Sequence, residues 1–107
     1  SQDASLAQSL HLLNAKDIQE KISSEKGRAA QLAADTTRND DDKLRDLYRW
    51  AYSRPPQSEE IQIAKAHLEK VAAKSSDEKG NAINGRRLAY EDIVWALINT
   101  KEFLFNH

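Results

Sequence analysis

Apolar residues recur at helical spacing in separate stretches of the chain, with polar or helix-breaking residues between them. The clearest stretch has four such residues at positions i, i+3, i+4 and i+7: Leu44, Leu47, Tyr48 and Ala51. This spacing places the four side chains on one face of a helix. Pro55 and Pro56 should end that helix, because a proline disfavours helical geometry in the residue before it. The pattern predicts a helix over residues 44–53.

The same pattern predicts helices elsewhere along the chain. Short ones are expected around residues 6–13, 18–22 and 28–34, and longer ones over 58–74 and 87–99. Apolar residues nearly encircle the second half of the last helix, which predicts that this helix is central and that Trp95 is structural. Valine, a strand former, occurs only at Val71 and Val94. The sequence therefore predicts an all-α fold, a compact bundle of five or six short helices in a single domain over residues 1–107.

Residues 75–86 have no helical pattern. They contain two of the three glycines, including the turn-forming pair Asn84 and Gly85, and their only sizeable apolar residue is Ile83. Ordering such a loop costs backbone entropy with little burial in return. We expect it to be the most mobile internal segment.

Charge and composition argue against two classes of partner, nucleic acids and membranes. Sixteen basic and seventeen acidic side chains leave a formal charge of −1, so the chain lacks the overall basic field of a nucleic-acid-binding protein. No apolar run approaches the roughly 20 residues that cross a bilayer, and the first residues lack the charged-then-apolar pattern of a signal peptide. We expect neither nucleic-acid binding nor membrane insertion. Because the chain does not start with Met, we also expect it to be part of a longer protein.

No pattern in the sequence indicates catalytic, metal-binding or cofactor-binding residues. The absence of cysteine excludes a thiolate nucleophile and a zinc-thiolate site, and the three histidines match no metal motif. His67 lies beside an apolar stripe and is better interpreted as a boundary residue satisfied by water or a carboxylate than as a catalytic base. The run Asp40, Asp41 and Asp42 lacks the spacing of a calcium loop and is interpreted as a solvated helix start.

Three residues are candidates for contacts with a partner. Arg45 and Arg49 lie four residues apart on the helix 44–53 and could bind an anionic partner, although Asp42 and Asp46 can neutralise them. Trp50 flanks the apolar face of the same helix and could be an exposed anchor. The alternative for all three is an ordinary solvated or boundary position.

Arg54, Phe103 and Phe105 are further candidates for structural roles. Arg54 follows the helix 44–53, and we expect helix-end carbonyls or a carboxylate to hold its guanidinium. The two phenylalanines lie near the end of the chain, where a frayed tail would leave both rings in water. We expect the tail to fold back onto Leu10 and Leu13. The alternative is an exposed tail that anchors another domain.

Three segments together resemble a known family. They are Ser9-Leu10-His11-Leu12-Leu13-Asn14, Leu47-Tyr48-Arg49-Trp50-Ala51-Tyr52-Ser53-Arg54-Pro55-Pro56, and the stretch from Tyr90 to His107, which reads YEDIVWALINTKEFLFNH. In this order they resemble the C-terminal part of a planctomycete family of long proteins. Its members carry a domain of unknown function, often behind a planctomycete cytochrome-c-like domain. At Gln57 the chain departs from the family, where Thr or Ser commonly follows the prolines, so a capping box with Glu60 stays open.

The resemblance implies the C-terminal segment of an exported, extracytoplasmic protein, with His107 at or near its natural end. It implies no activity and no catalytic residues. Any haem would belong to other parts of the parent chain, because no Cys-x-x-Cys-His occurs here. We therefore expect a non-enzymatic C-terminal module, without a cofactor, that packs against other domains of the parent protein or a protein partner. The alternative is part of an extracytoplasmic hydrolase or redox enzyme, to which this segment contributes Arg54, Glu102 or His107.

Overall fold

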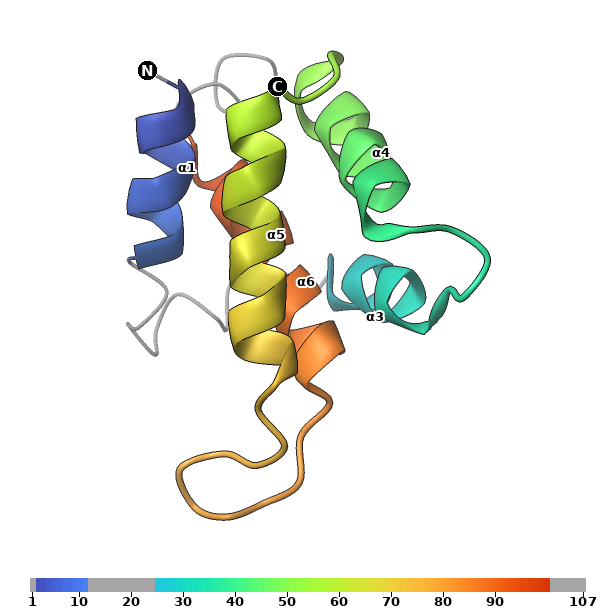
Figure 1. Cartoon of the computed structure of the whole chain (residues 1–107), viewed down its shortest axis with the longest axis vertical. Coiled ribbons are helices and arrows are strands. Elements are labelled where there is room, and N and C mark those ends of the chain that lie inside the picture. Colours follow the sequence, from blue (N-terminus) through green and yellow to red (C-terminus); the bar gives the residue numbers. More distant parts are fainter. Residues whose placement is uncertain (1, 12–24, 101–107) are drawn as a thin grey trace.

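Five helices make up the computed structural model, which describes residues 2–11 and 25–100 (Figure 1). They are α1 (Gln2–His11), α3 (Lys26–Ala34), α4 (Asp40–Tyr52), α5 (Ser58–Ala72) and α6 (Gly85–Ile98). Within the described ranges there is no strand, only an isolated antiparallel bridge between Ser76 and Ala82. The predicted all-α class is confirmed. The helix expected at residues 18–22 and the packing expected for Phe103, Phe105 and Leu13 lie outside the described residues.

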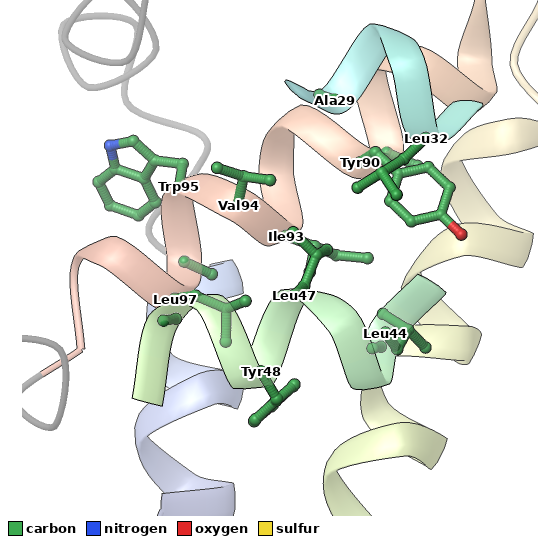
Figure 2. Packing of buried hydrophobic residues seen from close by; sticks show 14 of the residues in the cluster. Ala29, Leu32, Leu44, Leu47, Tyr48, Tyr90, Ile93, Val94, Trp95 and Leu97 are labelled. Carbon is green, nitrogen blue, oxygen red and sulfur yellow. The ribbon is translucent and has the colours of Figure 1, made fainter. Parts of the chain in front are cut away.

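The last helix is the centre of the bundle, as its apolar pattern predicts. α3 and α5 make the most extensive contacts with α6, and α1 and α4 also pack against it. Every residue of α6 from Ala89 to Leu97 is buried, and Trp95 is only 5% exposed. Figure 2 shows side chains of α6 and α4 meeting in the core, with Ile93 close to Leu47.

α4 begins at Asp40, in the aspartate run that the sequence predicts as a helix start and four residues before the first apolar residue of its stripe. The Asn39 side chain accepts a hydrogen bond from the Asp42 N–H at 2.9 Å, which caps the helix. One turn in, Lys43 is buried, and its Nζ donates to the Asp35 carbonyl at 2.6 Å. The apolar stripe gives no sign of this turn, which is stabilised by a cap and by paired charges, but the aspartate run indicates it.

The connection between α4 and α5 follows the predicted boundary. α4 ends at Tyr52, and Ser53 has the left-handed φ of 58° while its N–H donates to the Arg49 carbonyl at 3.0 Å. α5 then starts at Ser58, where the Glu60 carboxylate accepts a hydrogen bond from the Gln57 N–H at 2.8 Å. The capping arrangement that the sequence left open is therefore present with Gln at this position.

α6 starts two residues before the expected boundary, so Gly85 and Arg86 belong to the helix and not to the loop. The Asn84 side chain accepts a hydrogen bond from the Arg87 N–H at 3.2 Å and caps the helix. A Cβ atom on Gly85 would lie 2.7 Å from the carbonyl oxygens of Val71, Ala72 and Lys74. This glycine thus allows the start of α6 to approach the end of α5. The pair Asn84 and Gly85 is a helix start and not a turn.

The loop between α5 and α6 folds over itself at its tip. The Asp77 carboxylate accepts hydrogen bonds from the N–H groups of Lys79 and Asn81 at 2.9 and 2.8 Å. Gly80 has a φ of +83°, a conformation that favours glycine. The residues from Ala73 to Ala82 are exposed, and Ile83 is half-buried.

We expect the amides of residues 75–83 to exchange with solvent faster than those of α6. The reason is that this loop has little buried apolar surface to oppose local opening. Amide hydrogen exchange followed by mass spectrometry measures the difference, with α4 as an internal reference. Protection equal to that of α6 would contradict this expectation.

Candidate functional site

A groove of about 440 Å³ lies between α1, α5 and α6. Six of its lining residues are apolar: Ala7, Leu10, Ile63, Ala66, Val71 and Leu88. Five are polar or charged: His11, His67, Lys70, Lys74 and Asp92. We call this hollow the α1/α5/α6 groove. Its volume falls in the range of sites that bind ligands or peptide side chains.

α5 supplies one long wall of the α1/α5/α6 groove. Its lining residues follow helical spacing over about three turns, with Lys74 just beyond the helix end: Ile63, Ala66, His67, Lys70, Val71 and Lys74. α1 supplies Ala7, Leu10 and His11 opposite. The two helices lie side by side and run in the same direction (Figure 1). The groove is therefore elongated along α5, with Ile63 and Ala66 toward one end and Lys70, Val71 and Lys74 toward the other.

A histidine and a carboxylate pair within this groove. His67 Nε2 lies 2.8 Å from Asp92 Oδ2, and the two side chains are 15% and 11% exposed. The pair joins α5 to α6 and fulfils the interpretation of His67 as a boundary residue satisfied by a carboxylate. An imidazole oriented by a carboxylate can also act as a general base. The lining residues of the described groove, however, include no Ser, Thr or Cys that this base could activate.

The structure leaves the three predicted interaction residues on α4, away from the α1/α5/α6 groove. Arg45 is exposed and pairs with Asp42 at 2.8 Å, whereas Arg49 is exposed in the last turn. Trp50 is half-buried, and the Arg28 guanidinium lies over its ring at 4.2 Å from the centroid. In Figure 1, α4 and α1 lie on opposite sides of α5.

Arg54 is held at the junction of α4 and α5 by a carboxylate. Its Nη1 and Nη2 atoms donate to the two Glu60 carboxylate oxygens at 2.9 and 3.0 Å, and Nη1 also donates to the Pro55 carbonyl at 2.8 Å. The Arg54 guanidinium carbon lies 5.5 Å from the ring centroids of Tyr48 and Tyr52. The Glu60 side chain is only 2% exposed. The Arg54 side chain is 26% exposed, so the pair lies at the edge of the core, where it joins the end of α4 to the start of α5.

A second polar cluster links the start of α4 to α6. The Asp40 carboxylate accepts hydrogen bonds from Arg86 Nη2 at 2.8 Å and from the Tyr90 hydroxyl at 2.5 Å. Burial tends to raise the pKa of Asp40, but the hydrogen bonds from Arg86 and Tyr90 outweigh it and lower the pKa below the ordinary 3.8. Burial and the same hydrogen bond raise the pKa of the Tyr90 hydroxyl. The aspartate run is thus only partly solvated, since Asp40 is engaged with α6.

Replacing Asp40 with asparagine should lower the free energy of unfolding by about 1 kcal/mol at pH 7, because both charged partners are partly exposed. The folded pKa of Asp40 is depressed, so its contribution is present above the unfolded value and is lost as the pH falls through the folded pKa. The difference between Asp40→Asn and the natural chain should therefore shrink in acid. Urea unfolding between pH 7 and pH 2.5 measures it, and a difference that does not change with pH would contradict the assignment.

Other features of a functional site are absent from the part of the chain that the structure describes. Residues 2–11 and 25–100 contain no group of three or more His, Cys, Asp or Glu side chains that could hold a metal ion. In the same ranges, no helix has both the length and the apolar content of a membrane span.

Comparison with known proteins assigns no relative to this chain. No protein-family model, no curated protein and no solved structure matches it.

The sequence patterns did not single out Lys70, Lys74 or Asp92 as site residues. Lys70 and Lys74 belong to the polar side of α5, which ordinarily faces solvent, and Asp92 lies 25 positions after its partner His67. The signal that could have indicated a groove is a second helical stripe on α5. It begins at Ile63 and Ala66, beside the buried stripe of Ala64 and Leu68.

Proposed function

We propose that this chain is a non-enzymatic helical module that packs against the rest of its parent protein or against a protein partner through the α1/α5/α6 groove. The observation that carries the proposal is the exposed apolar side of the groove. Leu10, Ile63 and Leu88 are only half-buried although each contacts the core, and Ala7 and Ala66 are exposed beside them. A partner that covers these side chains gains the free energy of removing apolar surface from water.

The resemblance to the planctomycete family extends this proposal. It makes the module the C-terminal segment of an extracytoplasmic protein, and it makes the preceding domains of the parent protein the first partner to test. Candidate contacts outside the groove are Trp50, Arg45 and Arg49 on α4. No metal or cofactor is part of the proposed function.

The test is binding between this chain and the preceding part of its parent protein, measured by isothermal titration calorimetry. Ile63→Glu places a charge on the apolar side of the groove and should weaken binding at least tenfold. Gln62→Glu is the matched control, because Gln62 is the exposed neighbour on α5 and does not line the groove. Circular dichroism melting shows that both variants fold. Equal binding by both variants would contradict the use of this groove.

The pairing of His67 with Asp92 favours one alternative, in which this segment completes an extracytoplasmic hydrolase or redox enzyme. In that case the rest of the parent protein would supply the nucleophile. Of the residues first considered for this role, Arg54 is already bound to Glu60, and Glu102 and His107 lie outside the described residues. His67→Gln in the parent protein tests the alternative: loss of turnover of an activated ester with docking unchanged would favour the enzyme.

A further inference from the structure

We infer that the occupant of the α1/α5/α6 groove is an acidic amphipathic helix of a protein partner, an inference that rests on the proposed function. The shape of the groove fits such a helix. The groove wall on α5 extends from Ile63 to Val71, about 12 Å at 1.5 Å per residue, and Lys74 continues it beyond the helix end. α1 borders the groove from the opposite side. An elongated trough between helices accommodates the apolar face of a short helix of about three turns.

The charge of the groove favours an acidic partner. Among the described residues that line the groove, Asp92 is the one acidic side chain, and it is paired with His67. Lys70 and Lys74 have no ion pair with any carboxylate among the described residues, and both are exposed at one end of the groove. Several other surface cations are paired, namely Arg45 with Asp42, Lys65 with Asp41, and Arg87 with Glu91, while Lys26, Arg49 and Lys79, unpaired within the described ranges, lie outside the groove. The charge that the groove offers to a partner is therefore positive.

The apolar residues and the lysines follow one another along the groove. Ile63 and Ala66 lie in the first half of the α5 wall, Lys70 lies near the end of α5, and Lys74 lies just beyond it. A partner helix that places apolar residues against Ile63 can present two carboxylates, one turn apart, to the end of the groove that holds the two lysines. Such pairs attract oppositely charged partners and fix their register, and the two lysines disfavour a partner that has like charges at the same positions. The groove therefore selects an amphipathic helix whose acidic residues cluster toward one end.

Binding of synthetic peptides to the full chain tests this inference. The probe is a three-turn amphipathic helix with leucines at i, i+3, i+4 and i+7 and two glutamates one turn apart near one end. A second peptide has lysines in place of the glutamates, and a third has the composition of the first in scrambled order. Fluorescence anisotropy at 50 mM salt should show the glutamate helix binding at least tenfold more tightly than either of the others. Higher salt should reduce this preference.

A pair of double variants locates the effect. Lys70→Glu with Lys74→Glu should reverse the preference, so that the lysine peptide binds more tightly. Lys26→Glu with Lys79→Glu changes the net charge equally at two exposed positions outside the groove and should leave the preference unchanged.

Three outcomes would overturn the inference: equal binding of the glutamate and lysine peptides, equal binding of the scrambled peptide, or an equal response of the two double variants. If these occur while Ile63→Glu still weakens docking to the parent protein, the acidic helix is wrong and the proposed function stands. If Ile63→Glu also leaves docking unchanged, the proposed function fails with it.

Discussion

Arg54→Ala should lower the free energy of unfolding by about 3 kcal/mol. The substitution leaves the Glu60 carboxylate, which is 2% exposed, with the Gln57 N–H as its remaining hydrogen-bond donor among the contacts described above. Removing the cation that pairs with a buried carboxylate is costly, because the remaining charge is desolvated without compensation. The variant also loses the packing of the guanidinium against the rings of Tyr48 and Tyr52. Urea unfolding at pH 7 measures the effect.

A double-mutant cycle separates the ion pair from the loss of packing. Arg54→Ala combined with Glu60→Gln should be less destabilised than the sum of the two single variants, because no unpaired charge is left buried. Arg45→Ala is the matched control. Arg45 also pairs with a carboxylate, but both side chains are about half exposed, so the change should be below 1 kcal/mol. An unchanged unfolding curve for Arg54→Ala together with lost partner binding would assign Arg54 to the interface instead.

Gly85→Ala should lower the free energy of unfolding by about 3 kcal/mol, the upper part of the range for overpacked positions. The new methyl group would lie 2.7 Å from three backbone carbonyl oxygens at the end of α5. Backbone atoms cannot rotate away as a flexible side chain can, so α5 and α6 must move apart. Differential scanning calorimetry of the variant measures the loss.

Gly27→Ala is the control for this prediction. Gly27 also lies in the first turn of a helix, α3, but a Cβ atom there meets nothing within 4 Å. Alanine has the higher helix propensity, so this variant should be as stable as the natural chain or more stable by up to about 1 kcal/mol. If both glycine variants behaved alike, the close approach of α6 to α5 would not be the cause.

Some features of the fold follow from residues close together in the sequence, and others do not. The apolar spacing at Leu44, Leu47 and Tyr48 predicts α4 from local physics alone, because a 3.6-residue period places such side chains on one face. Apolar residues surround α6 on nearly all sides, and this predicts that neighbouring helices bury it at the centre of the bundle. The aspartate run and Ser58 predicted the starts of α4 and α5, whereas the start of α6 was predicted two residues too late. Asn39 and Asn84 begin their helices through side-chain caps, which leave no apolar signal in the first turn.

By itself, the sequence determined the helical class and the segments that form the core, because both depend on residues within a few positions of each other. Only the tertiary structure decided which charges are paired. Asp40 meets Tyr90 across 50 positions and His67 meets Asp92 across 25, distances over which no sequence period operates. The groove is a product of the same packing. The sequence pattern assigns one face of α5 to solvent. In the structure α1 lies beside this face, so its apolar residues and lysines line the groove.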